Sequence, residues 1–122
     1  MERPAWNAFN TTCPTRQVLS CIADKWAVLI VGALRESPRR TGQLRRMIEG
    51  ISQKMLTQTL RNLERDGLVS RRDLGINPPA VEYALTPLGQ SLAQIVDDLR
   101  HWAEGNIEQI LDARQRFNQP SV

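Results

Sequence analysis

One predicted helix carries the side chains best suited to chemistry, and that chemistry is nucleic-acid recognition. Apolar residues recur at helical spacing between residues 52 and 66, so one side of the helix should be buried and the other exposed. The exposed side carries six polar residues: Ser52, Gln53, Lys54, Thr57, Gln58 and Arg61. Gln pairs with adenine and Arg with guanine in the major groove, so we expect Gln58 and Arg61 to read base edges. Ser52 and Lys54 are expected to contact phosphates.

Start and stop signals define this helix. Ser52 can accept a hydrogen bond from a backbone N–H of the first turn, so the helix should begin near Gln53. Gly67 can adopt the left-handed conformation that ends a helix, and Leu68 can then fold back on Leu63. A shorter helix capped by Thr41 precedes it. Residues 41–66 therefore predict a helix-turn-helix.

A wing is expected next, over residues 67–86. Residues 68–73 and 81–85 are strand candidates, and the sequence GINPPA between them is typical of a turn. Arg71, Arg72 and Asn77 are the candidate DNA contacts of this segment. Because side chains alternate across a strand, we expect only one of the two arginines to reach a phosphate or the minor groove, and the sequence leaves open which one.

Two further helices are expected before the helix-turn-helix. Pro14 should begin the first, and the second should run over residues 25–35. The apolar side of the second is predicted to comprise Trp26, Leu29, Ile30 and Leu34.

The last predicted helix, residues 87–115, has an apolar stripe too wide for a small domain to cover. Its residues follow alternating steps of four and three, the spacing of a coiled-coil seam: Leu88, Leu92, Ile95, Leu99 and Trp102. We expect part of the stripe to be buried against a second copy of the chain. The predicted dimer interface comprises Leu19, Leu92, Ile95, Leu99 and Trp102. The predicted fold class is α+β, a winged helix-turn-helix with a two-stranded wing and a long C-terminal dimerisation helix.

Composition and charge agree with a small DNA-binding protein. The chain has 122 residues, 41% of them hydrophobic, which suits one domain with a modest core. Its net charge is +3, and ten of its 16 Lys and Arg residues lie between residues 35 and 72. This distribution favours a polyanionic partner. No apolar run is long enough to cross a bilayer and no signal-peptide pattern is present, so we expect a cytoplasmic protein without membrane contact.

The two cysteines differ in their predicted environments. Cys13 lies at the start of the first helix, where the helix dipole and nearby Arg16 would lower its pKa, so it is a candidate redox sensor. A passive thiol is the alternative. Cys21 reads as a small buried residue. No metal site or cofactor is expected, and the sequence lacks the paired carboxylates, nucleophile–base sets and phosphate loops of enzymes.

Several short sequences together resemble the HxlR family of bacterial winged-helix transcriptional regulators, relatives of the MarR group. The matching pieces are CP at 13–14, DKW at 24–26, GIS at 50–52, LERDGLVSR at 63–71 and PPAVEYALTPLG at 78–89. The resemblance covers roughly residues 13–104. It implies a homodimer that joins through terminal helices and binds an operator near a regulated gene. Some members respond to electrophiles or oxidants through a cysteine at the position of Cys13.

We therefore expect a single domain over residues 13–117, with a flexible arm at 1–12 and a tail at 118–122. The predicted function is sequence-specific binding of a homodimer to a pseudo-palindromic double-stranded DNA operator. Its effector is either an oxidant or electrophile acting on Cys13, or a small molecule bound at the dimer interface. A winged-helix module that binds proteins without reading DNA is the rival class. The operator, the regulated genes and the direction of regulation do not follow from the sequence.

Overall fold

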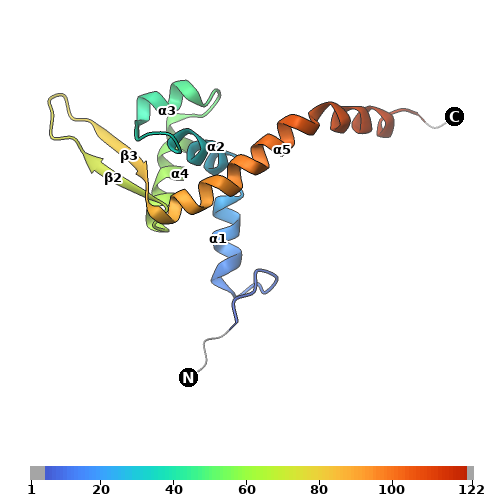
Figure 1. Cartoon of the computed structure of the whole chain (residues 1–122), viewed down its shortest axis with the longest axis horizontal. Helices are drawn as coiled ribbons and strands as arrows, with labels where there is room; N and C mark the ends of the chain where they lie inside the picture. Colours follow the sequence, from blue (N-terminus) through green and yellow to red (C-terminus); the bar gives the residue numbers. More distant parts are fainter. Residues whose placement is uncertain (1–4, 121–122) are drawn as a thin grey trace.

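The computed structural model describes residues 5–120, in which five helices and three short strands form a winged helix-turn-helix (Figure 1). The elements in order are α1 (Pro14–Ile22), α2 (Lys25–Leu34), β1 (Arg39–Arg40), α3 (Thr41–Met47), α4 (Gln53–Arg65), β2 (Val69–Asp73), β3 (Val81–Leu85) and α5 (Pro87–Phe117). The α+β fold class is thereby confirmed. Residues 1–4 of the expected arm and 121–122 of the expected tail lie outside the described residues.

The ends of α4 follow the predicted local signals. Ser52 Oγ accepts a hydrogen bond from the Met55 N–H at 3.0 Å. At the other end Gly67 has a φ of 76°, a left-handed conformation that glycine adopts without a Cβ penalty. The Leu68 N–H then donates to the Leu63 carbonyl at 2.9 Å, which closes the helix with the hydrogen bond of a Schellman motif. The buried side of α4 consists of Leu56, Thr59, Leu60 and Leu63.

The sheet has three strands, one more than the two-stranded wing that we predicted. The strand order is β1-β3-β2 and both pairings are antiparallel. The added strand β1 places Arg40 opposite Glu82 in an extended conformation. For this reason the prediction that Thr41 caps α3 is wrong: the cap position is Arg40, and Thr41 is the first helical residue. Gln43 Oε1 accepts a hydrogen bond from the Arg40 N–H at 2.8 Å.

Helix α2 forms the centre of the core. It begins after Asp24, whose Oδ2 accepts hydrogen bonds from the Trp26 and Ala27 N–H groups at 3.0 and 3.3 Å. Its buried residues are Ala27, Ile30, Val31 and Leu34. Trp26 and Leu29, which we expected on the apolar side, are only half-buried. Since α2 packs against both α4 and α5, its buried face includes Ala27 and Val31 in place of Trp26 and Leu29, while Ile30 and Leu34 are buried as predicted.

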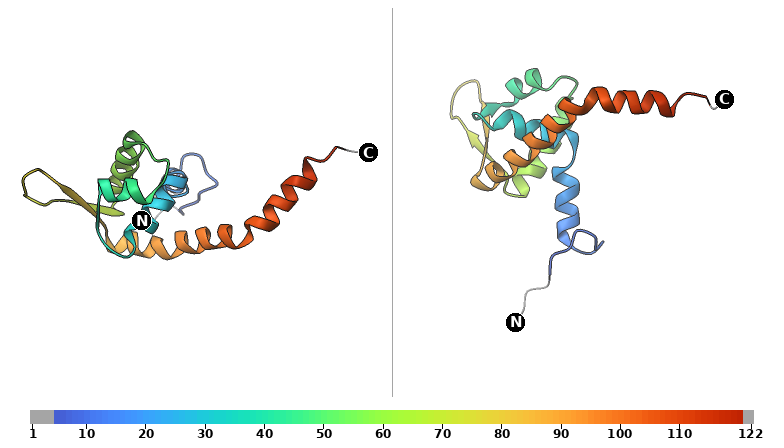
Figure 2. Two further views of the ribbon diagram at one scale, coloured as in Figure 1. Left: turned by 90° about the horizontal axis from the view of Figure 1, so that it is seen from above. Right: turned by 45° about the vertical axis from the view of Figure 1, so that its right-hand side comes forward.

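Helix α5 is long and only its first part belongs to the globular domain (Figure 2). Thr86 caps it as predicted, because Thr86 Oγ1 accepts a hydrogen bond from the Gly89 N–H at 3.1 Å. Its buried residues are Gly89, Ala93, Val96 and Asp97. The C-terminal half then runs away from the rest of the molecule (Figure 2). In the described part of the chain no single helix is long and apolar enough to cross a membrane.

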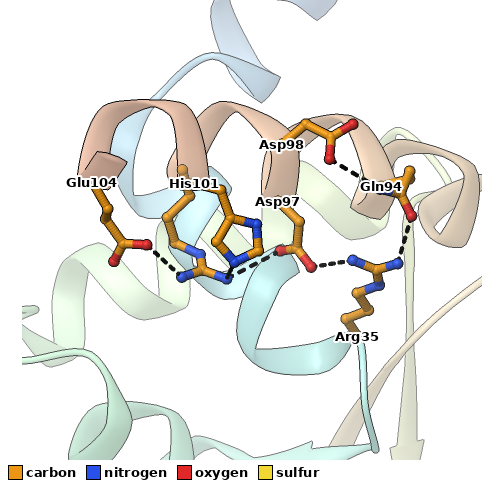
Figure 3. A network of polar contacts seen from close by, with 7 residues as sticks. Arg35, Gln94, Asp97, Asp98, His101 and Glu104 are labelled. Carbon is orange, nitrogen blue, oxygen red and sulfur yellow. Dashed lines mark hydrogen bonds and ion pairs between the residues drawn. The ribbon is translucent and has the colours of Figure 1, made fainter. Parts of the chain in front are cut away.

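A polar network fixes α5 to the end of α2 (Figure 3). The carboxylate of the buried Asp97 pairs with the Arg35 guanidinium, and its Oδ1 lies 3.8 Å from Arg100 Nη2. Arg35 Nη2 also donates to Gln94 Oε1 at 2.6 Å, and Arg100 Nη1 donates to Glu104 Oε1 at 3.0 Å. A buried carboxylate is stable only when it is paired, so this network sets where α5 leaves the domain.

Candidate nucleic-acid interface

The exposed face of α4 presents the predicted reading residues to solvent. Gln53, Lys54, Thr57, Gln58 and Arg61 are all exposed, opposite the buried leucines. Gln53 Nε2 donates to Thr57 Oγ1 at 3.1 Å. Within residues 5–120 the side chains of Lys54, Gln58 and Arg61 have no hydrogen bond or ion pair. They are therefore free to bind a ligand, whereas Ser52 is already engaged as the helix cap.

Three neighbours of this face were not among the predicted DNA contacts. Arg45 of α3 donates from Nη1 to Gln53 Oε1 at 3.5 Å, so it adjoins the start of the reading face. Asn62 and Arg65 line the same open surface further along α4. Arg65 Nε is paired with Asp66 Oδ1 at 3.2 Å. The sequence indicated Arg45 only as part of the basic segment 35–72, because its proximity to Gln53 depends on how α3 packs beside α4.

The two wing arginines lie in different environments on opposite faces of β2. Arg72 is opposite Glu82 in the sheet, and Arg72 Nη2 pairs with Glu82 Oε1 at 3.0 Å. Arg71 is opposite Tyr83 and makes no ion pair with any described residue. Asn77 is exposed at the tip, where the Asp73 side chain accepts a hydrogen bond from the Gly75 N–H at 2.9 Å. The wing projects away from the core (Figure 1).

Positive charge without a carboxylate partner is concentrated on the helix-turn-helix and the wing. Among the described residues eleven Lys and Arg side chains make no ion pair, and six of these are exposed on the helix-turn-helix and the sheet: Arg40, Arg45, Arg46, Lys54, Arg61 and Arg71. All six are exposed, and all lie on β1, α3, α4 or β2. A surface of this kind attracts a polyanion.

The family of the chain follows from its sequence. The family model for HxlR-like helix-turn-helix proteins matches residues 21–111. The chain belongs to this family. It is a transcriptional regulator of the helix-turn-helix type, as its relatives are.

Individual relatives of this HxlR-like regulator agree in sequence and structure. It is 45% identical over 108 residues to the HTH-type transcriptional regulator YtfH of Escherichia coli, and the match covers 88% of this chain and 86% of YtfH. The structure of the transcriptional regulator ytfH from Salmonella typhimurium is 43% identical with a TM-score of 0.87, covering 91% of this chain and 99% of that one. The redox regulator HypR in its oxidized form is 38% identical with a TM-score of 0.71, and the corresponding coverages are 77% and 97%.

Cys13 of this HxlR-like regulator is the cap residue of α1 and is held in a polar environment. Its Sγ lies 3.3 Å from Thr15 Oγ1 and accepts a hydrogen bond from the Asn7 N–H at 3.3 Å. These contacts, first the Thr15 hydroxyl and then the Asn7 N–H, lower the pKa of Cys13 from its ordinary value. We had expected Arg16 and the helix dipole to have this effect. The causes are hydrogen bonds within residues 7–15, one of them from the Thr15 backbone N–H in the first turn of α1, and Arg16 is not among them.

Cys21 differs from Cys13 in burial and in pKa. It is half-buried and packs against the core, so its prediction as a small buried residue holds only in part. Burial, followed by the nearby charge of Asp66, raises the pKa of Cys21. Both cysteines are free thiols. At a given pH Cys13 therefore has the larger thiolate fraction, and the thiolate is the reactive form.

The predicted dimerisation residues of this regulator lie mostly on an exposed apolar surface. The exposed fractions of Leu19, Ile95, Leu99 and Trp102 are 49%, 64%, 55% and 61%. Leu92 is half-buried and packs against the core. The apolar surface continues along the projecting end of α5 through Ile107 and Leu111. Exposed apolar residues on this scale are typical of an interface.

Proposed function

We propose that this HxlR-like regulator binds a pseudo-palindromic DNA operator as a homodimer, with one α4 helix in each of two major grooves. The observation that carries the proposal is the face of α4 on which Lys54, Gln58 and Arg61 are exposed and make no side-chain contact to another polar group of residues 5–120. The other face of the same helix is buried in the core, so the helix is held rigidly while its polar side chains stay available.

A second copy of the chain would bring two reading helices together. The exposed stripe on α5, with Leu19 of α1, supports assembly through these helices. We expect the two copies of α4 to face half-sites about one helical turn apart, ~34 Å. A palindromic operator matches the two-fold symmetry of such a dimer.

The direct experiment selects bound duplexes from a random DNA pool and then compares two variants on the selected operator and on random DNA. Arg61→Ala should weaken operator binding by about 1–3 kcal/mol and relax preference at one base pair, because it removes a bidentate base contact. Lys54→Ala should weaken binding to all sequences alike. Arg116→Ala is the matched control, since it removes one positive charge from the far end of α5.

Each result distinguishes between functions. If Arg61→Ala lowers the affinity for the operator and for random DNA by the same factor, Arg61 does not contact a specific base. If neither variant changes DNA binding and the pool yields no enriched sequence, the protein-interaction module becomes the better explanation. A monomer in sedimentation at micromolar concentration would reject the dimer.

We further propose that electrophiles or oxidants regulate DNA binding through Cys13. Its lowered pKa and polar contacts support this role, as does the similarity to the redox regulator HypR. With a quinone, the Cys13 thiolate adds to a ring carbon: a C–S bond forms, the ring C=C π bond breaks, and its electrons move to a carbonyl oxygen, which takes up a proton from water. The attacked carbon then loses its hydrogen as a proton and the second carbonyl oxygen takes up a proton, which gives the hydroquinone adduct. Helix α1 packs against α2 and α4, so modification at its start can shift the reading helices.

The regulatory proposal is tested by following operator binding while the dimer is titrated with a quinone. A loss of only about 1.4 kcal/mol gives tenfold weaker binding. The Cys21→Ser variant should lose operator affinity on quinone treatment as the parent does. The Cys13→Ser variant should remain bound to the operator. If Cys13→Ser releases DNA on treatment as the parent does, or if the parent never releases it, a non-covalent ligand at the dimer interface becomes the better explanation.

A further inference from the structure

A pocket of about 330 Å³ lies where α5 passes α2 and the end of α3. Helix α2 forms one wall, the turn from α3 to α4 forms the second, and Arg100 of α5 lines the third side. Small-molecule sites in proteins measure about 300–1,000 Å³. The pocket can therefore hold a small organic molecule, and it shares no residue with the predicted DNA contacts or with Cys13.

Apolar side chains on two walls of the pocket are only partly covered by the rest of the chain. Leu29 and Ala33 of α2 are half-buried, and Met47 at the end of α3 is 50% exposed although its neighbour Ile48 is buried. Methionine is unbranched and adapts its shape to what it contacts. Gly32 also lines the pocket and adds no side chain to fill it. A hydrophobic group bound here would bury apolar surface that the chain leaves exposed.

The charged groups around the pocket carry an excess of one negative charge. The Arg100 guanidinium lies between two carboxylates: its Nη1 is 3.0 Å from Glu104 Oε1, and its Nη2 is 3.8 Å from Asp97 Oδ1. Asp97 also pairs with Arg35 (Figure 3). Glu49 is exposed at the pocket and makes no ion pair within residues 5–120. The two arginines are therefore matched by Asp97 and Glu104, and the Glu49 carboxylate is left for a cation.

Glu49 gives the pocket its chemical preference. Arg45 and Arg46 of α3 share a separate hollow with Glu49, but neither forms an ion pair with it. An ammonium group is a compact cation with three hydrogen-bond donors, so it suits an exposed carboxylate. A ligand carboxylate would instead be repelled by Glu49. The pocket therefore favours a protonated amine with a hydrophobic body over a neutral or anionic molecule of the same shape.

We propose that this pocket binds a small hydrophobic amine, with its hydrocarbon part against Leu29 and Met47 and its ammonium group at the Glu49 carboxylate. The consequence for DNA rests on the proposed function. The Ile51 N–H donates to the Ile48 carbonyl at 3.4 Å, so the pocket wall is joined directly to the start of α4. A ligand held between this turn and α5 changes how the reading helix is placed relative to the proposed dimerisation helix. Operator and amine binding are then coupled, and each changes the affinity for the other by the same factor.

The experiment measures binding to the full chain by calorimetry with three probes of one shape: phenylbutylamine, phenylbutanol and phenylbutyrate. The amine should bind most tightly and the carboxylate most weakly. Glu49→Gln should weaken amine binding about threefold, the effect of an exposed ion pair, and should leave the alcohol unchanged. Glu64→Gln is the matched control, because Glu64 is an exposed carboxylate of α4 outside the pocket. Ala33→Leu fills the pocket and should abolish binding of the amine and of the alcohol, with an unchanged circular dichroism spectrum.

Several results would overturn this site. Equal affinity for the amine and the carboxylate, or unchanged amine affinity in Glu49→Gln, rejects the cationic class of ligand. Unchanged amine binding in Ala33→Leu places the probe elsewhere on the chain. If no probe binds, the pocket takes no such ligand, and weaker self-association of Ala33→Leu in sedimentation then shows that a second copy of the chain covers it.

The coupling to DNA is measured separately, by comparing operator affinity with and without saturating phenylbutylamine. In the parent this affinity should change by about fivefold or more, and in Ala33→Leu it should not respond. An equal response of Ala33→Leu, or none in the parent, would reject the coupling. If the parent binds no operator while Glu49 still determines amine affinity, the proposed function fails and the pocket stands.

Discussion

Gly89 is the place where α5 comes closest to the wing, and its replacement by alanine tests that packing. A Cβ at this position would collide with the backbone carbonyl oxygen of Leu68 and would lie 3.1 Å from Leu85 Cδ2. The Leu68 carbonyl belongs to the backbone, so it cannot move aside as a flexible side chain can. The start of α5 would have to move away from the sheet instead.

The cost of that movement can be worked out from the contacts it strains. The Thr86 N–H donates to the Leu68 carbonyl at 3.1 Å, and the Thr86 hydroxyl donates to the Gly67 carbonyl at 2.6 Å. Overpacking of this kind destabilises by about 1–3 kcal/mol, and loss of one of these hydrogen bonds adds about 1 kcal/mol. Alanine favours the helix over glycine by about 1 kcal/mol. We expect Gly89→Ala to lower the free energy of unfolding by about 1–3 kcal/mol.

Gly105 provides a matched control in the same helix. A Cβ there would meet nothing within 4 Å among the residues that the structure describes, so Gly105→Ala should raise the free energy of unfolding by about 0.5–1 kcal/mol through helix propensity alone. Both variants are measured by urea unfolding at one protein concentration, because stability of a dimer depends on concentration. The packing argument is refuted if Gly89→Ala is as stable as the parent, or if both substitutions change stability equally.

Further substitutions test the other contacts. Ser52→Ala should lower the free energy of unfolding by about 1 kcal/mol in a denaturant titration, because it removes the cap of α4; no change would show that the cap is dispensable. Leu99→Glu should convert the dimer to a helical monomer, seen by sedimentation and circular dichroism, because it places a charge in the exposed apolar stripe; an intact dimer would locate the interface elsewhere. Alkylation by iodoacetamide should reach its half-maximal rate at a lower pH for Cys13 than for Cys21. Hydrogen bonding lowers the pKa of Cys13, and burial raises the pKa of Cys21. A lower half-maximal pH for Cys21 would contradict both pKa directions. Asp97→Asn should cost about 1.5–3 kcal/mol in thermal unfolding, because it weakens charged hydrogen bonds between α2 and α5; an unchanged melting temperature would show that α5 is held by apolar packing alone.

The recognition helix was predictable from the sequence because its ends are set by local contacts. Ser52 and the Met55 N–H are three residues apart, and the closing hydrogen bond joins Leu63 to Leu68. The leucine stripe likewise repeats within one helix, so its periodicity is visible in the sequence. The strand pair of the wing and the capped start of α5 follow from neighbouring residues in the same way.

The third strand could not be predicted because two residues carry no periodic signal. Arg39 and Arg40 become a strand only because β3 offers them a free edge. That pairing holds Arg40 extended, and it is the reason that α3 begins at Thr41 rather than after it. The position of the α3 N-terminus therefore depends on pairing with the distant strand β3, whereas the local sequence predicted Thr41 as the cap.

Side-chain partners across the fold were likewise decided by tertiary structure. The sequence predicted that Arg71 and Arg72 would differ, but only the register with β3 showed that Glu82 pairs with Arg72, while Arg71 makes no ion pair with a described residue. The pair of Arg35 and Asp97 joins residues 62 positions apart. The sequence by itself determined the family, the helix-turn-helix, the wing and the polar face of α4, because each of these depends on residues a few positions apart. The charge left unpaired on the surface depends on which distant residues the packed core brings together, and only the folded chain contains that information.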